Sequence, residues 1–367
     1  MPKPIKILFT IPNFDTAGSG KVVYDLVRGL DKNKFNPEIC CFHDKGAFFK
    51  EIEELGVPIH LFKFTAAYKP FTSLPFRIHN IYKFFKKHKF DLIHSWHWSS
   101  DFTEPLAAKM AGIPFVYTKK AMGWGNKSWR WRTHLSSKII AINKDMLEQF
   151  FSNYKSKMVY MPLGVDTTKF SYLEIKRNTP CGLVFKVSDF VIVSIANLVP
   201  VKGIEVLLNA VKQLDNENIQ VLIVGDKDNT YGESLEKEFA SKQVHFIGKQ
   251  LDVKAYLAVA NVFVIPTKNE GRKEGMPLAP LEAMASGRLV IGSNIAGIKD
   301  ILGNFKSFLF EAGNSQALAA IIIEIMNMTN EERLSLGREL RRNVENSYSL
   351  ESCIKHHESL YINLLKV

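Results

Sequence analysis

The sequence predicts an α/β protein of two domains, each built around a parallel sheet with helices on both faces. In the first half, short apolar runs alternate with segments of helical spacing, and these runs span 5–11, 37–42, 59–64, 90–96, 115–118 and 138–142. The alternation starts again in the second half, with runs at 190–197, 220–225, 244–248, 261–266 and 289–293. Repeated strand–helix units are typical of parallel sheets. A chain of 367 residues is long enough for two such domains.

The restart of this pattern predicts the domain boundary. Glycine, aspartate, threonine, lysine and proline gather between 162 and 181, as they do in linkers. We therefore expect a first domain over residues 1–170 and a second domain over residues 171–347. Each would be Rossmann-like, with functional side chains at the carboxyl ends of its strands.

Charge is distributed unevenly along the chain, whose formal net charge is +11. Residues 1–180 hold 28 lysines and arginines against 15 aspartates and glutamates, a net charge of +13. A basic half joined to a near-neutral half indicates that one domain meets an anionic partner. The candidate partners are a membrane surface, a phosphorylated acceptor and a nucleic acid.

Cysteine usage and hydropathy bear on the compartment. The four cysteines show no C-x-x-C spacing, which favours a reducing cytosol. The N-terminus runs into a strand without a signal-peptide pattern, and no apolar run of about 18 residues predicts a membrane span. We expect a cytoplasmic protein, with peripheral attachment to the inner membrane face as an option.

Two glutamates eight positions apart, Glu274 and Glu282, mark the most specific motif. A buried strand precedes them, a turn of Gly275, Met276, Pro277 and Leu278 separates them, and a helix begins near 281. Backbone N–H groups at a helix start can hold a diphosphate. Carboxylates beside it would bind hydroxyls, as in ribose and a sugar, so the motif suits a nucleotide sugar. The alternative is a loop with two solvated glutamates.

This motif resembles the Glu-x7-Glu signature of the retaining glycosyltransferases of family 4 (glycosyl transferases group 1). The resemblance implies the GT-B fold, in which two Rossmann-like domains face each other across a cleft. It also implies a terminal helix, here 350–365 within the segment 348–367, that crosses back to the first domain. Glu282 would bind ribose hydroxyls, and Glu274 would bind the donor sugar.

Lys202 stands just before a predicted helix, where a lysine is a good point charge for phosphate. Its surroundings are similar to the family's Gly-Arg-Leu-x-x-x-Lys-Gly motif, but Asn197 replaces the usual arginine. Arg272 or Lys273 could supply the missing charge, or Lys202 and backbone N–H groups could suffice. The alternative for Lys202 is a solvated lysine at a helix start.

Other predicted donor contacts rest on the resemblance. Gly18 and Gly20 resemble the family's first glycine loop, although a plain turn is the alternative. Gly225 follows the second strand of the second domain, and Gly248 and Lys249 end the segment whose backbone reads the base. Asp226-Lys227-Asp228 spells D-x-D, which we interpret as loop carboxylates, because the family needs no metal.

Polar and aromatic residues of the first domain are candidates for the acceptor. His97 follows the strand 90–96 and could bind a sugar or acceptor hydroxyl, whereas we expect His94 to be a core residue. Tryptophans and cations interleave between 119 and 132, a mix that suits an anionic amphipathic acceptor, a bilayer interface or single-stranded nucleic acid. The predicted acceptor or membrane residues are Lys119, Lys120, Trp124, Lys127, Trp129, Arg130, Trp131 and Arg132. The alternative is tryptophans folded inward under a solvated basic face.

Together with these patterns, the resemblance implies a retaining hexosyl- or N-acetylhexosaminyltransferase of polysaccharide or glycolipid biosynthesis. It would move a sugar from a UDP- or GDP-linked donor to a hydroxyl of a glycan, lipid-linked or phosphorylated acceptor. Lys202, Glu274 and His97 would be the catalytic residues, and no metal or other cofactor is expected. Two alternatives stay open, a nucleotide-sugar-binding protein with weak catalysis and a nucleic-acid-binding protein.

Overall fold

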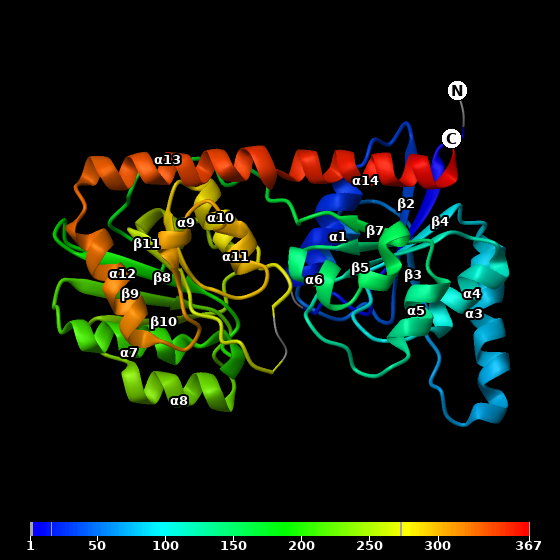
Figure 1. Cartoon of the computed structure of the whole chain (residues 1–367), viewed down its shortest axis with the longest axis horizontal. Coiled ribbons are helices and arrows are strands. Elements are labelled where there is room, and N and C mark those ends of the chain that lie inside the picture. The colour runs from blue at the N-terminus through cyan, green and yellow to red at the C-terminus, as the bar shows by residue number, and fades with distance from the viewer. Residues whose placement is uncertain (1–2, 16, 272–273, 367) are drawn as a thin grey trace. The chain divides into compact units, whose positions relative to one another are not determined.

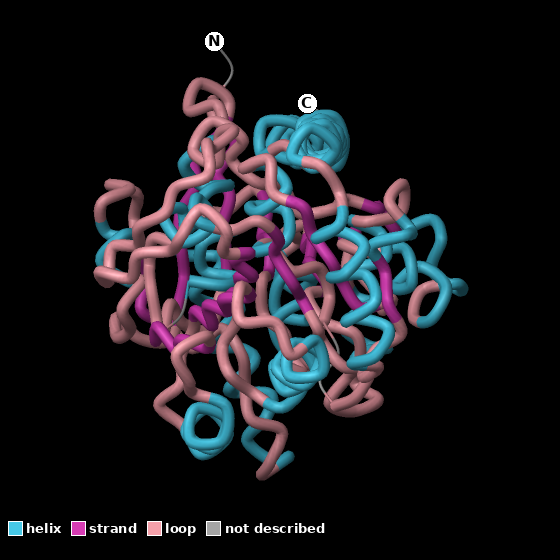
Figure 2. The backbone as a smooth tube through the Cα atoms, turned by 90° about the vertical axis from the view of Figure 1, so that its left-hand side faces the viewer, coloured by secondary structure: helices cyan, strands magenta, loops and turns pink. Residues whose placement is uncertain are grey.

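A computed structural model of the chain describes residues 3–15, 17–271 and 274–366. The chain divides into two compact units. The first comprises Met1–Leu163 and Glu351–Val367, and the second comprises Gly164–Leu350. Each unit has one parallel sheet flanked by helices (Figure 1), and helices and loops lie around the strands in the tube view (Figure 2). The predicted α/β class with two Rossmann-like domains is confirmed.

The first unit contains a seven-stranded sheet in the order β3-β2-β1-β4-β5-β6-β7. Its strands are β1 (Ile5–Thr10), β2 (Phe35–Cys41), β3 (Ile59–Leu61), β4 (Leu92–Ser95), β5 (Phe115–Lys119), β6 (Lys138–Ala141) and β7 (Met158–Tyr160). All neighbouring strands pair in parallel. The central strands are mostly buried and largely apolar, because helices cover both faces of the sheet.

Helices connect these strands. They are α1 (Ala17–Gly29), α2 (Phe49–Glu53), α3 (Leu74–His88), α4 (Thr103–Ala111), α5 (Trp129–Leu135) and α6 (Lys144–Gln149), with short 3-10 helices at Phe71–Ser73 and Ser152–Lys157. The sequence pattern does not predict β7, α5 and α6, each of seven residues or fewer. Such short elements carry too few residues for a clear period.

The last helix, α14 (Leu350–Leu365), belongs to the first unit, as predicted. Its Tyr361 hydroxyl lies 2.7 Å from Nδ1 of His94 in β4, and Asp31 N donates to Glu358 Oε1 at 2.8 Å. Gly29 of α1 lets the helix approach, since a Cβ there would lie 2.2 Å from the side chain of Ile354. His94 is fully buried and also bonds Thr118 Oγ1 at 2.8 Å, so its prediction as a core residue is confirmed.

The second unit contains a six-stranded sheet in the order β10-β9-β8-β11-β12-β13. Its strands are β8 (Phe190–Ile195), β9 (Ile219–Val224), β10 (Val244–Gly248), β11 (Val262–Ile265), β12 (Leu289–Ser293) and β13 (Leu309–Phe310). Its helices are α7 (Ile204–Leu214), α8 (Thr230–Phe239), α9 (Lys254–Val259), α10 (Ala279–Ala285), α11 (Ile298–Ile301), α12 (Ser315–Asn327) and α13 (Asn330–Ser347), with 3-10 helices at Pro200–Lys202 and Lys306–Phe308. In each sheet the strand order reverses once, between β1 and β4 and between β8 and β11.

The boundary between the units comes earlier than residue 170. Val165 N donates to Tyr348 O, and Leu350 N donates to Val165 O, both at 2.9 Å. Arg341 of α13 also donates to Phe170 O at 3.0 Å. These hydrogen bonds to the backbone explain why residues from Gly164 onward pack with the second unit.

Candidate active site

The two predicted donor residues Lys202 and Glu274 meet at the carboxyl edge of the second sheet. Lys202 lies in the loop after β8, and Glu274 lies in the loop after β11. These are the strands between which the strand order reverses, and open α/β sheets bind ligands outside the carboxyl ends of such strands. Topology therefore supports this edge of the sheet as a binding site.

A close backbone contact positions Lys202. Gly203, the next residue, has φ +64°, and a Cβ there would lie 2.2 Å from Pro266 O at the end of β11. Lys268 N also donates to Val201 O at 2.8 Å. Only glycine allows the two loops to approach so closely. The Lys-Gly pair that the sequence singled out thus joins the two loops.

Lys202 and Glu274 form an ion pair and a hydrogen bond between Nζ and Oε2. Their side chains are 20% and 23% exposed, so both charged groups remain accessible to a ligand. The adjacent turn is buried against a second loop, because a Cβ on Gly297 would lie 2.1 Å from Gly275 O. Gly297, which has φ +79°, therefore holds the Glu274 turn in position.

Glu282 lies in α10 and is 8% exposed. Its backbone N donates to Leu278 O at 2.9 Å, so the helix is already formed at this residue. Pro280 near the helix start favours that geometry, since its missing N–H is not needed there. Because α10 spans only seven residues, we expect Lys202 to attract an anion more strongly than the helix dipole does.

A second cation, Lys268, lies beside Lys202 and was not predicted. Its Nζ forms ion pairs with Glu205 Oε1 and Glu270 Oε1, both at 2.7 Å. Hydrogen bonds to Glu205 and Glu270 raise the pKa of Lys268. Tyr231 donates its hydroxyl to the other oxygen of Glu205, and burial raises the pKa of Tyr231. Lys268 follows a buried strand, the same signal that led to Glu274.

The remaining predicted donor residues have mixed placements. Gly225 has a packing role, since a Cβ there would lie 1.8 Å from Ala196 O. Gly248 ends β10 with φ +77°, and the side chains of Asn197 and Lys249 are exposed beside the same sheet edge. Asp228 N donates to Asp226 Oδ1 at 3.2 Å, a turn within the D-x-D segment. Arg272, predicted to help hold the diphosphate, lies outside the described residues, as does Lys273.

The prediction that Gly18 and Gly20 lie in a loop is wrong. Helix α1 begins at Ala17, so both glycines are in its first turn. A Cβ on Gly20 would lie 3.0 Å from the ring of Phe14 and 3.3 Å from that of Phe48. Gly20 therefore allows the helix start to pack against these rings. The turn still follows β1, a strand at the reversal of strand order in the first sheet.

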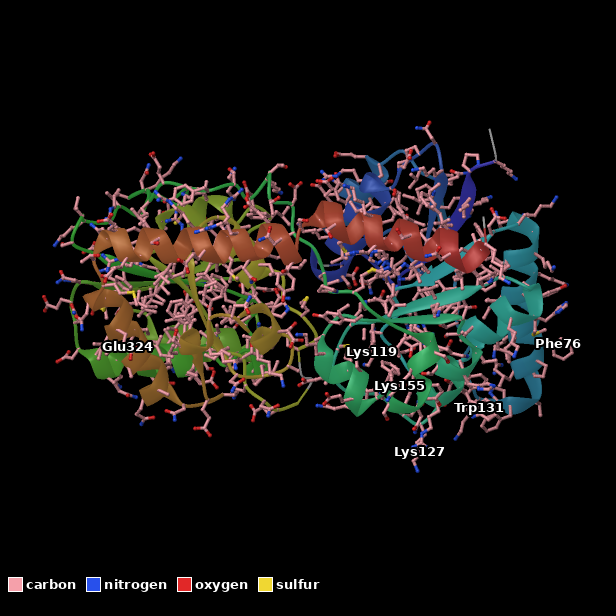
Figure 3. The ribbon with its side chains drawn as sticks, turned by 45° about the horizontal axis from the view of Figure 1, so that its top comes forward. Phe76, Lys119, Lys127, Trp131, Lys155 and Glu324 are labelled. Carbon is pink, nitrogen blue, oxygen red and sulfur yellow. The ribbon has the colours of Figure 1, made fainter. Side chains whose placement is uncertain are left out.

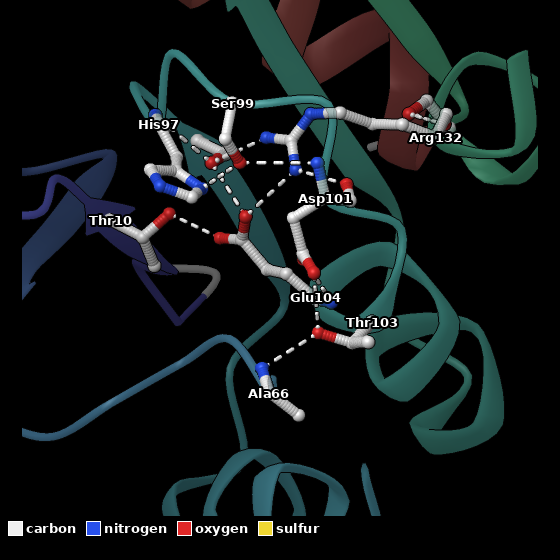
Figure 4. A network of polar contacts seen from close by, with 10 residues as sticks. Thr10, Ala66, His97, Ser99, Asp101, Thr103, Glu104 and Arg132 are labelled. Carbon is white, nitrogen blue, oxygen red and sulfur yellow. Dashed lines mark hydrogen bonds and ion pairs between the residues drawn. The ribbon is translucent and has the colours of Figure 1, made fainter. Parts of the chain in front are cut away.

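His97 lies at the other side of that reversal, just after β4, in a pocket of about 320 Å³. The pocket is lined by Thr65, Ala66, Ala67, Tyr68, His97, Ser99, Ser100, Asp101 and Asn126. His97 Nδ1 lies 2.9 Å from Ser99 Oγ, and burial lowers the pKa of His97 to about 3 (Figure 4). The ring is therefore neutral at physiological pH and suits a hydrogen bond to a sugar hydroxyl.

Arg132 was predicted to contact the acceptor or a membrane, and this prediction is wrong. Its side chain is fully buried and forms an ion pair with Glu104 Oε2 at 3.2 Å. It also donates to Asp101 O and Ser95 Oγ, both at 2.9 Å (Figure 4). These bonds fix the loop after β4, on which His97 lies. Burial raises the pKa of Glu104 to about 7 despite the nearby guanidinium.

Lys119 is likewise buried, so its prediction as an acceptor or membrane residue is wrong. Its Nζ lies 3.9 Å from the ring centroid of Trp124 and donates to Gly123 O at 2.5 Å. Trp124 and Trp129 stack at 5.0 Å and contact Phe150. For these residues the alternative of inward tryptophans is the correct one.

Part of the predicted surface does reach solvent. Lys127, Arg130 and Trp131 are exposed, the last by 63%, and Figure 3 shows Lys127 and Trp131 at the surface. Lys120 is half-buried, and its Nζ donates to Ser19 Oγ of α1 at 3.1 Å. Across the described ranges, the structure contains no helix with the length and apolar character that a membrane span requires.

Comparison with protein families gives matches in both units. The family described as "Glycosyltransferase Family 4" matches residues 16–169, and "Glycosyl transferases group 1" matches residues 178–343. The chain belongs to the glycosyltransferases of family 4, or group 1. The two matches meet near the boundary between the units and include both sets of predicted site residues.

Relatives and solved structures agree with this assignment. The glycosyltransferase is 25% identical over 313 residues to the Escherichia coli "UDP-Gal:alpha-D-GlcNAc-diphosphoundecaprenol alpha-1,3-galactosyltransferase", covering 78% of this chain and 79% of that one. It is 30% identical over 185 residues to the Staphylococcus aureus "Capsular polysaccharide biosynthesis glycosyltransferase CapM", covering 48% of this chain and 47% of the relative.

The solved structures share the fold. A glycosyltransferase from Rickettsia africae matches with a TM-score of 0.85 at 19% identity, covering 100% of both chains. The Anabaena protein HepE, in complex with UDP-glucose, matches with a TM-score of 0.77 at 18% identity, covering 97% of this chain and 99% of that one. This glycosyltransferase therefore has the GT-B fold.

Proposed function

We propose that this glycosyltransferase transfers a hexosyl or N-acetylhexosaminyl group from a nucleotide diphosphate sugar, with retention of configuration. The acceptor is a hydroxyl of a glycan or of a lipid-linked saccharide. The observation that carries the proposal is the pairing of Lys202 with Glu274 where the strand order of the second sheet reverses. A cation for the diphosphate and a carboxylate for the sugar stand together there.

Names of relatives support the substrate class. The Escherichia coli relative is named for a UDP-galactose donor and a diphosphoundecaprenol acceptor, and HepE was solved with UDP-glucose. We therefore favour UDP as the donor nucleotide, with GDP as the second candidate. Relatives named for capsular polysaccharide and colanic acid support a cell-surface glycan as the proposed product.

The bound donor replaces the ion pair between Lys202 and Glu274 with its own contacts to each residue. A diphosphate binds the Lys202 ammonium, and the Glu274 carboxylate that Lys202 releases accepts hydrogen bonds from the donor sugar. Glu282, only 8% exposed, accepts hydrogen bonds from ribose hydroxyls. Hydrogen bonds to a charged group contribute about 1.5–3 kcal/mol each, which compensates for opening the Lys202–Glu274 ion pair.

Transfer then follows a front-face route. The acceptor oxygen bonds to the anomeric carbon while the bond from that carbon to the phosphate oxygen breaks on the same face. The departing phosphate oxygen takes the acceptor proton, so no separate general base is required. Lys202 and the N–H groups of the turn Gly275–Leu278 stabilise the negative charge that develops on the diphosphate.

The acceptor is bound by the first unit. The pocket at His97 offers a neutral imidazole, hydroxyls and amide groups, which suits the hydroxyls of an uncharged sugar ring. Exposed Lys127, Arg130 and Trp131 would contact the phosphate or lipid part of a lipid-linked acceptor at an anionic membrane. This arrangement separates recognition of the sugar from recognition of its carrier.

The decisive experiment begins with the donor. Nucleotide diphosphates of uridine, guanosine, adenosine and thymidine are screened for thermal stabilisation, since a ligand at about 100 times its Kd adds roughly 2.7 kcal/mol. The matching radiolabelled nucleotide sugars are then incubated with a lipid-linked saccharide, and the anomeric configuration of the product is read by NMR. Absence of stabilisation by every nucleotide would refute the proposed function.

A second candidate is a nucleotide-sugar-binding protein without turnover. Asn197 favours it, because an arginine is usual at this position in the family motif and Asn197 adds no charge to Lys202. Asn197→Arg separates the two readings. If the wild type transfers sugar to a permissive acceptor, the candidate is excluded. If only the Asn197→Arg variant transfers sugar, the natural chain is the binding protein.

A further inference from the structure

A second candidate ligand site lies in the second unit, away from the donor residues. A pocket of about 470 Å³ opens at the start of β11 and β12, where Asn261 and Leu289 line it. Its cationic lining consists of Arg177, Arg288, Arg333 and Arg338, and Glu174 is its single acidic residue. A neighbouring hollow of similar volume shares Tyr172 and Arg338 and adds Arg341 and Arg342.

This location separates the pocket from the donor site. Lys202 and Glu274 follow the carboxyl ends of β8 and β11. The pocket contacts the residues at the amino ends of β11 and β12. The two ends of a strand lie at opposite edges of a parallel sheet, so no donor residue contributes to the pocket.

Most of these arginines form no ion pair with an acidic residue of the described chain. Of the six, only Arg341 forms an ion pair within the described part of the chain, with Glu345 at 2.7 Å. Arg177 donates to the carbonyl oxygens of Asp189 and Val187, both at 3.2 Å. Carbonyl groups orient a guanidinium without neutralising it, so the positive charge of the pocket is left for a ligand.

Arg288 shows this most clearly. It is 3% exposed and donates through one Nη to Leu173 O, while its buried Nε has no hydrogen-bond partner among the described residues. Burial lowers the pKa of Arg288 to about 10, so the group stays charged at neutral pH. A buried cation with an unused donor is unfavourable unless an anion binds nearby.

The choice of arginine over lysine is also informative. Between 181 and 367, every arginine that the structure describes lines one of these two hollows, while none of the 13 described lysines does. Arginine binds phosphate through two parallel N–H bonds, which lysine cannot do. Arg338 and Arg342 are also one turn apart on α13, and like charges at that spacing destabilise a helix. A bound anion would remove this cost.

The pocket and the neighbouring hollow share Tyr172 and Arg338, and together they are called the arginine pocket. We propose that the arginine pocket binds a small molecule carrying two or more phosphate groups, at a site distinct from the donor site. The phosphates contact Arg288, Arg338 and Arg342. The ring of Tyr172, 38% exposed, and the side chain of Leu334, 39% exposed, supply an apolar surface for the organic part of the ligand. The concave shape favours a small ligand over a membrane, which would meet a convex or flat face.

The test is calorimetric titration with inorganic tripolyphosphate and, separately, with ATP. The variant Arg338→Ala/Arg342→Ala removes two exposed charges and should fold normally, which circular dichroism checks. Lys237→Ala, an exposed lysine on α8 of the same unit, is the matched control for loss of charge. Lys202→Ala reports on binding at the donor site.

Both probes should bind the wild type, and the double arginine variant should weaken binding at least tenfold. Lys237→Ala should leave the affinity of tripolyphosphate unchanged, and Lys202→Ala should affect only tripolyphosphate bound at the donor site. Tighter binding of ATP than of tripolyphosphate would show that Tyr172 and Leu334 contribute.

Three results would overturn the proposal. The first is that neither tripolyphosphate nor ATP binds the wild type. The second is that Lys202→Ala weakens probe binding but the double arginine variant does not. The third is that Lys237→Ala weakens probe binding as much as the double arginine variant does. Binding of the wild type but not of the arginine variant to anionic vesicles, without binding of either probe, would assign the patch to a membrane instead. None of these results depends on the transfer reaction.

Discussion

Replacing Arg132 by methionine should destabilise the first unit by about 3–5 kcal/mol, because it leaves a buried carboxylate without its counter-charge. Arg132 and Glu104 are both fully buried, and Arg132 donates to Glu104, Ser95 and an Asp101 carbonyl. For a unit of this size each kcal/mol lowers Tm by about 2–4 °C, so the expected shift is about 6–20 °C. Asp101 and Ser95 would lose a donor as well.

Tryptophan fluorescence isolates the unit of interest. All five tryptophans of the chain lie between 96 and 131, so their emission follows the unfolding of the first unit alone. This selectivity matters because a chain of two units need not unfold in one step. The matched control is Arg130→Met, an exposed arginine on the same helix, whose substitution should change stability by no more than about 0.5 kcal/mol.

A variant that lacks both buried charges and the pH dependence of stability complete the test. Glu104→Gln/Arg132→Met should recover most of the loss, because it removes both buried charges. Burial raises the pKa of Glu104 to about 7 in the folded state, above its unfolded value, so this group costs stability as pH rises between the two values. Removing Arg132 raises that pKa further, so the variant should lose more at about pH 8 than at about pH 5. Equal unfolding curves for Arg132→Met and Arg130→Met would refute the reasoning.

The remaining predictions concern donor, metal and membrane. Glu282→Ala should weaken binding of the donor nucleotide about tenfold to a hundredfold by calorimetry, and an unchanged affinity would remove Glu282 from the site. Lys202→Ala should lower kcat more than it weakens nucleoside binding, so equal losses would argue against a role at the leaving diphosphate. Transfer activity should survive EDTA, and activity lost to EDTA but restored by magnesium or manganese would contradict the metal-free mechanism. The wild type should co-sediment with anionic vesicles at low salt more than Lys127→Ala/Arg130→Ala does, whereas equal sedimentation would leave these residues without a membrane role.

Most strands of both sheets could be predicted because parallel strands are buried on both faces and read as continuous apolar runs. The exceptions are β7 and β13, which have only three and two residues. Helix α13 could not be predicted by the same means, since its sequence is largely polar. A capping box at its start was the available signal, because Thr329 and Glu332 bond each other's backbone N–H groups. Helices with mostly polar surfaces are better predicted from their caps than from their hydropathy.

The burial of Arg132 could not be predicted from its neighbours in sequence. Trp129, Arg130, Trp131 and Arg132 alternate in type, and this pattern suggests a surface segment. In helix α5, Trp131 faces solvent and Arg132 points inward. There Arg132 contacts Glu104, which is 28 residues earlier in the chain. The stability of a buried charge depends on such a distant partner, which composition does not reveal.

The ion pair between Lys202 and Glu274 links the lysine motif physically to the motif of two glutamates. The residues are 72 positions apart, yet the close approach of Gly203 to Pro266 brings their loops together before any ligand arrives. An ion pair exposed by about a fifth on each side contributes about 0–1 kcal/mol, so a diphosphate can displace it at little cost. We infer that the pair keeps the two loops ordered in the free enzyme and releases each group to its part of the donor. Charge-reversed Lys202→Glu/Glu274→Lys should therefore fold like the wild type but fail to bind the nucleotide diphosphate.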